Sequence, residues 1–154
     1  MKNTDKDLYF VAVKLLLRDK NKLLITHDIF GAWDVPGGRL KPDEFSKPLE
    51  SVIERKINEE LGVNIKYSIG KPVVFFRVER EEAGLDGKLV RIFAIGYEGD
   101  YLGGEIKLGD HHDRAEWVDL NSLDPKEYFK DGWENGIQDY INKTVLSQKQ
   151  TQEQ

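Results

Sequence analysis

The segment GGRLKPDEFSKPLESVIERKINEELGV, residues 37–63, decides the interpretation of this chain. Its two opening glycines leave bare backbone that can approach an ion or a phosphate closely. The apolar spacing that follows predicts a helix from about Pro48 to Leu61, because proline suits the first helical turn. We expect Gly62 to close this helix in the left-handed cap conformation.

Three charged side chains share one face of the expected helix. Lys56 lies three and four residues before Glu59 and Glu60, and residues at these spacings are neighbours on a helix surface. One interpretation is a solvated acidic face with a lysine that stabilises the helix. The other is a metal or phosphate site, which the glycine pair Gly37-Gly38 at the mouth of the same helix favours.

The rest of the chain alternates between strand and helix patterns. Apolar runs at 8–17 and 22–26, with a polar turn between them, predict two paired strands. Further predicted elements are a short strand before Pro36, a hairpin of strands 73–78 and 89–97, a strand at 116–120, and a second helical region from about Leu123 to Val145 that contains the unfavourable Gly132 and Gly136. This order predicts a mixed α+β sandwich.

Composition narrows the class of protein. A chain of 154 residues fits a single domain, which we place at 1–146, and the polar residues 147–154 are expected to be a disordered tail. The net charge of −5 disfavours nucleic acid as a partner, and the lack of cysteine excludes disulfides and thiolate metal sites. No signal-peptide core or membrane-spanning apolar run is present, so we expect a cytoplasmic protein without a membrane partner.

Residues 37–63 resemble the Nudix box, the signature of the Nudix (MutT-like) hydrolases. The family pattern is a glycine, five residues, a glutamate, seven residues, then Arg-Glu, an aliphatic residue, any residue, Glu-Glu, any residue, a glycine and an aliphatic residue. The resemblance extends over about residues 8–145, because AWDVPGGRL and EWVDLNSL are similar to segments that flank the box. It implies the Nudix fold, a three-layer α/β/α sandwich with a mixed β-sheet. The matching positions are Gly38, Glu44, Arg55, Ile57, Glu59, Glu60, Gly62 and Val63.

The match departs from the family pattern in two places. Ten residues instead of seven separate Glu44 from Arg55, which a three-residue insertion around 46–48 explains. A longer loop before the helix costs little entropy. The second departure is Lys56, which stands where the family has a glutamate.

The resemblance implies that metal-activated water hydrolyses a nucleoside diphosphate linked to another group. Mg²⁺ is the expected ion and Mn²⁺ the alternative, because hard divalent cations prefer carboxylate oxygens. The family's ligands that remain are Glu59, Glu60 and the carbonyl of Gly38. The motif residues with an expected structural role are Gly37, Glu44, Arg55 and Gly62, with an ion pair between Glu44 and Arg55.

Lys56 leaves two outcomes open, because its positive charge repels Mg²⁺. In the first, the ammonium neutralises Glu59 and Glu60 or contacts a substrate phosphate, and the protein is a hydrolase with fewer metal ions. In the second, the domain binds a nucleotide-like ligand in a regulatory role without turning it over.

A proton acceptor for water could come from the loop at 109–113. His111 and His112 lie there, and histidine has a suitable pKa for this role. The alternative is an exposed polar turn without a catalytic function. His27, at the end of an expected strand, is interpreted as a surface or packing residue.

Several residues outside the acidic helix are candidates for contact with the substrate. Arg39 follows the glycine pair and is the candidate phosphate ligand. Trp33 or Phe76 could stack on a base, although strand aromatics more often belong to the core. Arg77 and Arg91 are secondary cations. The expected partner is a small nucleotide-like substrate, and the resemblance leaves a homodimer open.

Overall fold

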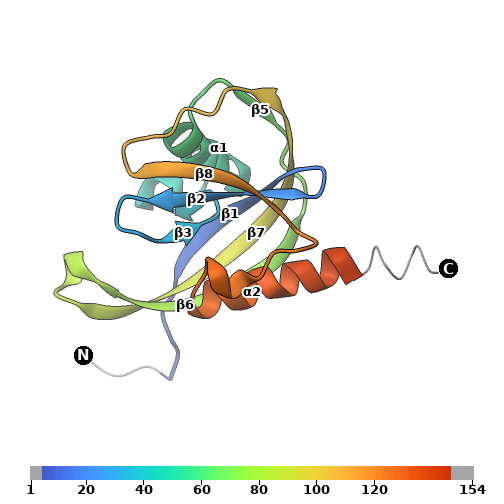
Figure 1. Ribbon diagram of the computed structural model, residues 1–154. Helices are drawn as coiled ribbons and strands as arrows, with labels where there is room; N and C mark the ends of the chain where they lie inside the picture. Colours follow the sequence, from blue (N-terminus) through green and yellow to red (C-terminus); the bar gives the residue numbers. More distant parts are fainter. Residues whose placement is uncertain (1–4, 147–154) are drawn as a thin grey trace.

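The computed structural model describes residues 5–146 and contains a mixed β-sheet between two helices (Figure 1). Helix α1 covers one face of the sheet and α2 the other. In chain order the elements are β1 (Phe10–Asp19), β2 (Lys22–Asp28), β3 (Trp33–Asp34), β4 (Gly37–Arg39), α1 (Leu49–Leu61), β5 (Ile65–Tyr67), β6 (Pro72–Glu82), β7 (Lys88–Gly104), β8 (His112–Asp119) and α2 (Asp131–Ile141). Short 3₁₀ turns lie at Pro42–Glu44, Ala83–Leu85 and Pro125–Glu127, and a π turn, Asn142–Leu146, follows α2.

The sheet is organised around β1. Its main strand order is β3-β2-β1-β7-β5, with β4 paired to β1, β6 to β7 and β8 to β2. Strands β1 and β7 run parallel over Phe10–Arg18 and Ile92–Asp100, and the other pairs are antiparallel. A continuous apolar strand such as β1 suits this central position, because side chains on both of its faces are buried.

Two core clusters lie on opposite faces of the sheet. Leu15 and Leu17 of β1 pack with the apolar face of α1, whereas Leu16 belongs to the cluster that contains Ile137 and Tyr140 of α2. The alternation follows from the twofold periodicity of a strand. The structure therefore confirms the predicted α+β class and the three-layer α/β/α arrangement of a mixed sheet.

The first helix and the long hairpin lie where the sequence predicts them. Helix α1 begins directly after Pro48, and β6 and β7 form the expected hairpin, whose far end projects from the sandwich (Figure 1). The predicted cap at Gly62 is only partly right. Its φ of 88° is positive, but its ψ of 179° is extended, and the Lys107 amide donates a hydrogen bond to the Leu61 carbonyl. The chain thus leaves α1 without a left-handed helical residue.

The second helix differs from its prediction. Only a 3₁₀ turn forms at Pro125–Glu127, and α2 begins at Asp131. Gly132 and Gly136 lie inside α2, and each would place a Cβ in contact with β6, 1.9 Å from the Arg77 carbonyl oxygen and 2.2 Å from the Phe76 ring. The two glycines are therefore needed for close packing of α2 on the sheet, at the expense of helix propensity.

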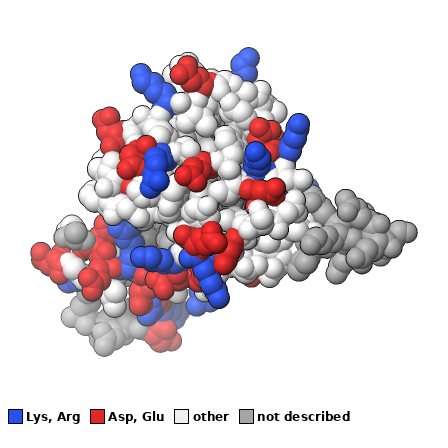
Figure 2. Space-filling model, viewed as in Figure 1, with Lys and Arg blue, Asp and Glu red and all other residues white. Residues whose placement is uncertain are grey.

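Both signs of charge are interspersed on the surface (Figure 2). They lie side by side over the projecting β6–β7 hairpin, where Arg91 pairs with Asp7 and Glu79. Within residues 5–146, neither α1 nor α2 has the length and apolar character of a transmembrane helix. The predicted tail at 147–154 lies outside the described residues.

Candidate active site

The glycine pair brings β4 close to both β1 and α1. Gly37 has a φ of +144°, and a Cβ there would lie 2.1 Å from the Val13 carbonyl oxygen. The Gly37 amide donates a hydrogen bond of 3.1 Å to Oε2 of Glu60. A Cβ on Gly38 would lie 2.6 Å from Cε of Lys56. Only glycine fits at position 37, and at position 38 a side chain would displace the end of Lys56, so this loop passes directly beneath the charged face of α1.

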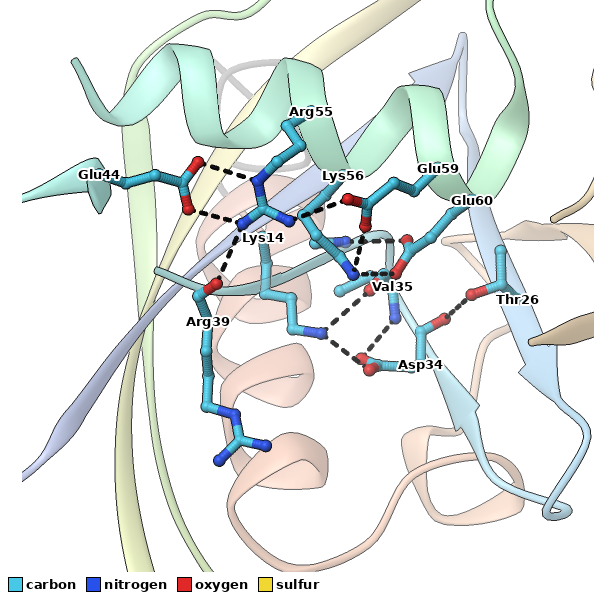
Figure 3. A network of polar contacts seen from close by, with 11 residues as sticks. Lys14, Thr26, Asp34, Val35, Arg39, Glu44, Arg55, Lys56, Glu59 and Glu60 are labelled. Carbon is cyan, nitrogen blue, oxygen red and sulfur yellow. Dashed lines mark hydrogen bonds and ion pairs between the residues drawn. The ribbon is translucent and has the colours of Figure 1, made fainter. Parts of the chain in front are cut away.

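The three predicted residues of α1 converge, as Figure 3 shows. The Lys56 ammonium lies 3.1 Å from Oε2 of Glu59 and 3.7 Å from Oε1 of Glu60. Arg55 donates a hydrogen bond of 3.1 Å to the other oxygen of Glu59. Both oxygens of Glu59 are thus engaged by cations of its own helix, and Glu60 is held by one ammonium and one backbone amide.

The two glutamates have different electrostatic environments. Glu60 is buried, and loss of solvation raises the pKa of its carboxyl group to about 7, against the opposing effect of the Lys14 and Lys56 charges. Partial burial also acts to raise the pKa of Glu59, but hydrogen bonds from Lys56 and Arg55 outweigh it and lower that pKa. Near neutral pH, Glu59 is therefore ionised, whereas Glu60 is close to its titration midpoint.

Glu44 and Arg55 form the predicted ion pair between loop and helix. Arg55 donates two hydrogen bonds, of 2.8 and 2.7 Å, to the two carboxylate oxygens of the buried Glu44. Its Nη2 also donates to the Arg39 carbonyl at 3.2 Å, and the Lys41 amide donates to Glu44 at 2.8 Å. The hydrogen bonds from Arg55 lower the pKa of Glu44 to about 2. This pair fixes the loop of residues 39–44 against α1.

Lys14 and Asp34 belong to the site, although sequence reasoning missed them. The Lys14 side chain is only 5% exposed, and its ammonium lies 2.8 Å from Oδ2 of Asp34, 3.3 Å from the Val35 carbonyl oxygen and 4.8 Å from the centroid of the Trp133 ring. Lys14 is the one charged residue in an apolar strand run, and a buried lysine needs partners. This single charged residue within an apolar strand was the feature of the sequence that could have identified Lys14.

A cavity of about 250 Å³ opens beside these residues. Arg39 lies on its wall, but its guanidinium is bound by Glu82 at 3.1 and 3.2 Å, so its charge is balanced there. Trp33 is half-buried on the wall, with ring contacts to His27 and Tyr128. The lining residues that bear on ligand binding are Lys14, Trp33, Asp34, Gly38, Arg39, Arg80 and Trp133.

Three of the residues expected to contact the substrate are placed elsewhere. The prediction that Phe76 stacks on a base is wrong, because its ring is only 1% exposed and packs against Trp133 and Gly136 in the core. Arg77 is the neighbour of Phe76 on β6 and is exposed, yet it does not line the cavity. Arg91 is likewise outside the cavity, in its ion pairs with Asp7 and Glu79. Arg80 is the arginine that β6 contributes to the wall.

The two histidines of the loop before β8 differ. His111 is exposed, whereas His112 is half-buried, and its Nδ1 is buried without a hydrogen-bond partner among the described residues. Burial lowers the pKa of His112, and the nearby Asp34 and Asp28 charges oppose that shift. The imidazole is therefore mainly neutral at pH 7. His27 is a packing residue whose Nδ1 lies 2.6 Å from Asp113 and whose ring contacts Trp33.

The donors around α1 do not fit a site for several metal ions. Among residues 5–146, no three carboxylate, imidazole or thiol side chains are grouped so that they could hold a metal ion. Glu59 and Glu60 offer carboxylate oxygens, and Gly38 offers a carbonyl, but the Lys56 ammonium lies among them. A cation at this point repels a second cation, so the donor set disagrees with the one that the sequence resemblance implies.

Comparisons with known proteins agree with the fold. A family model described as the NUDIX domain matches residues 8–136. An ADP-ribose pyrophosphatase from Methanocaldococcus jannaschii is 30% identical over 139 residues, which are 82% of this chain and 75% of that protein. The nucleoside triphosphatase NudI from Enterobacter sp. is 29% identical over 102 residues, 63% of this chain and 70% of that protein. The structure of a MutT protein from Methanosarcina mazei has a TM-score of 0.70 at 22% identity, over 96% of this chain and 99% of that one, which shows similarity of fold.

Proposed function

The chain belongs to the Nudix hydrolase family, and from this premise we propose that it hydrolyses a diphosphate linkage in a nucleotide-like substrate. The oxygen of water bonds to one phosphorus, the bridging P–O bond breaks, and a proton of the water passes to a basic group of the protein. The two products each keep one of the phosphoryl groups.

The observation that carries this proposal is the position of the box residues beside the cavity. Glu60 is held by the Gly37 amide, and the adjoining Gly38 lines the cavity wall. Backbone at this point can approach a phosphate without a side chain in the way. Buried Lys14 and the arginines Arg39 and Arg80 line the same wall, each beside a carboxylate, and their N–H groups suit contact with a diphosphate.

The relatives suggest the class of substrate. One is named as an ADP-ribose pyrophosphatase and the other as a nucleoside triphosphatase, so we propose ADP-ribose first and nucleoside triphosphates second. Trp33 and Trp133 on the cavity wall are the aromatic residues that could contact a base. The expected partner remains a small molecule. We retain as proposals a cytoplasmic location, a possible homodimer and the absence of nucleic-acid or membrane partners.

Glu60 and His112 are the two groups proposed for proton transfer. Glu60 is buried beside the glycine loop, and His112 presents an unpaired ring nitrogen. Mg²⁺, or Mn²⁺ in its place, is the ion that family membership suggests, with Glu59, Glu60 and the Gly38 carbonyl as the available donors. Because that donor set does not fit the family pattern, we assign no step to a metal ion.

One observation favours a second candidate function. The ion pairs of Lys56 occupy both glutamates, and such a site could bind a nucleotide-like ligand without turnover. A screen of phosphate-containing products decides between the two functions. It uses nucleoside triphosphates, nucleotide sugars, ADP-ribose and dinucleoside polyphosphates with Mg²⁺ and Mn²⁺, and compares wild type, Lys56→Glu and Glu60→Gln.

If the protein is a hydrolase, we expect wild type to cleave at least one of these substrates. We expect Glu60→Gln to cleave it more slowly by about a hundredfold or more. A silent wild type together with an active Lys56→Glu variant would establish the ligand-binding function instead. If Glu60→Gln turns over the substrate as fast as wild type, the reaction does not take place at this site.

A further inference from the structure

The ammonium group of Lys56 lies between two carboxylates that would otherwise hold a cation. Its distances of 3.1 Å to Glu59 and 3.7 Å to Glu60 are those of ion pairs. Its stem crosses over Gly38, whose missing side chain leaves room for Cε. We propose that Lys56 replaces a divalent ion at this position and binds the diphosphate of the ligand directly. The proposal rests on the proposed function for the class of ligand.

Charge balance supports this replacement. The ammonium of Lys56 donates a hydrogen bond to Glu59, and Arg55 donates to the same carboxylate from the other side. The attraction that a cluster of unpaired carboxylates exerts on a divalent ion is therefore largely cancelled. The protein supplies its own fixed positive charge where a bound ion would otherwise provide it.

Donor capacity explains why Lys56 is the cation that reaches the ligand. A lysine ammonium has three N–H donors, and Lys56 directs them toward only two carboxylates. The other cations that line the cavity each have an acidic partner, and for Arg80 this is Glu82, 3.8 Å from its Nε. Lys14 is held by Asp34, the Val35 carbonyl and the Trp133 ring, and both terminal nitrogens of Arg39 are bound by Glu82.

The location is also suitable for contact with a ligand. Gly38 lies on the cavity wall, and the end of the Lys56 side chain lies directly against it. The Lys56 side chain is 22% exposed, compared with 5% for Lys14. The proposal therefore places the phosphate at the Gly38 edge of the cavity, next to the end of the Lys56 side chain.

Metal binding by the free protein gives the first test. Mn²⁺ affinity is measured by titration calorimetry for wild type, Lys56→Glu, Lys56→Arg and the control Lys66→Glu, whose site on β5 is exposed. We expect Lys56→Glu to bind Mn²⁺ at least about tenfold more tightly than wild type, and Lys56→Arg and Lys66→Glu to bind it as weakly as wild type. Equal affinities of wild type and Lys56→Glu would overturn the proposal.

Ligand binding without metal gives the second test. ADP is titrated in the presence of EDTA into wild type, Lys56→Gln and Lys66→Gln, and circular dichroism shows that each variant is folded. We expect wild type and Lys66→Gln to bind ADP alike and Lys56→Gln to bind it at least about tenfold more weakly. Binding by wild type that requires Mg²⁺, or equal binding by Lys56→Gln, would overturn the proposal.

Both expected results are required, and neither depends on turnover. If the protein hydrolyses none of the substrates in the screen while both binding results hold, the proposed function fails and the role of Lys56 stands. If hydrolysis occurs but either binding result fails, the role of Lys56 is wrong and the hydrolase function stands.

Discussion

At the scale of single residues, the two glutamates of the site differ in pKa because their surroundings differ. Burial raises the pKa of Glu60 to about 7, whereas hydrogen bonds from Lys56 and Arg55 keep the pKa of Glu59 below its usual range. Two adjacent carboxyl groups of the same type therefore differ in charge near neutral pH. This difference allows one of them to exchange a proton while the other anchors cations.

His112 is expected to take part in turnover and His111 is not. His112 is half-buried, is mainly neutral at pH 7 and has an unpaired Nδ1, so it can accept a proton, whereas His111 is exposed. We predict that His112→Ala lowers kcat by about a hundredfold and that His111→Ala stays within about twofold of wild type. Steady-state kinetics on the best substrate of the screen would show this. Equal effects of the two substitutions would exclude His112 from the reaction.

Glu44 should make stability depend on acid pH. Its pKa is about 2 in the folded protein and near its ordinary value in the unfolded chain, so its contribution is fully present above about pH 4.5. That contribution is lost as the pH falls toward 2. We predict that the free energy of unfolding decreases less steeply between pH 4.5 and 2.5 in Glu44→Gln than in wild type, as urea titrations at each pH would measure. Equal slopes in the two proteins would contradict the assigned role of this ion pair.

Residue roles were predictable from the sequence where a motif defines them. The convergence of Lys56 with Glu59 and Glu60 follows from spacing on one helix, whereas the Glu44–Arg55 pair was expected from the resemblance to the Nudix box. Lys14, Asp34 and Arg80 could not be found in this way, because they reach the cavity from different strands. Phe76 was misassigned because alternation along a strand does not reveal which face is covered by a helix.

At the scale of elements, the packing of α2 on β6 depends on the absence of two side chains. Gly136 lies against the Phe76 ring and Gly132 against the Arg77 carbonyl. An alanine in an exposed helix position normally stabilises the helix by up to about 1 kcal/mol relative to glycine. At this crossing the added methyl group would instead push α2 away from the sheet.

We predict that Gly136→Ala lowers the free energy of unfolding by about 1–3 kcal/mol, because overpacking outweighs the gain in helix propensity. Asn135→Ala, on the exposed face of the same helix, should be neutral or slightly stabilising. Denaturant titration of both variants provides the measurement. The double variant Gly136→Ala/Phe76→Leu should recover part of the loss, and a stabilising effect of Gly136→Ala alone would show that the crossing is looser than described.

Local elements were easier to predict than their pairing. Helix α1 and the β6–β7 hairpin are marked by capping and turn residues that are close in sequence. The parallel pairing of β1 with β7 joins residues about 80 positions apart, and no local pattern records it. The start of α2 was placed too early because the 3₁₀ turn at Pro125–Glu127 has the sequence features of a helix start.

At the scale of the whole molecule, one strand supports both cores. Leu15 faces α1 and Leu16 faces the α2 side, and neither side chain is exposed. We predict that Leu15→Ala and Leu16→Ala each lower the free energy of unfolding by about 2–5 kcal/mol and that each variant unfolds in one transition. Val63→Ala, at a position that is 75% exposed, is the control. Two separate transitions in a calorimetric scan would mean that the two faces unfold independently.

The active site is also a property of the whole fold. Helix α1 supplies the acidic residues and Lys56, β1 supplies Lys14, β4 supplies the glycine loop, and α2 closes the cavity with Trp133. The central claim is that this assembly hydrolyses a diphosphate bond by attack of water on phosphorus. This claim requires that the protein cleaves the diphosphate bond and that the cleavage depends on Glu60.

The most direct test is to incubate wild type and Glu60→Gln with ADP-ribose in ¹⁸O-labelled water, with Mg²⁺ present, and to analyse the products by mass spectrometry. The proposed function predicts AMP and ribose 5-phosphate from wild type, one ¹⁸O atom in the phosphate of one product, and about a hundredfold less product from Glu60→Gln. Equal amounts of product from the two proteins, or no cleavage by wild type, would contradict it.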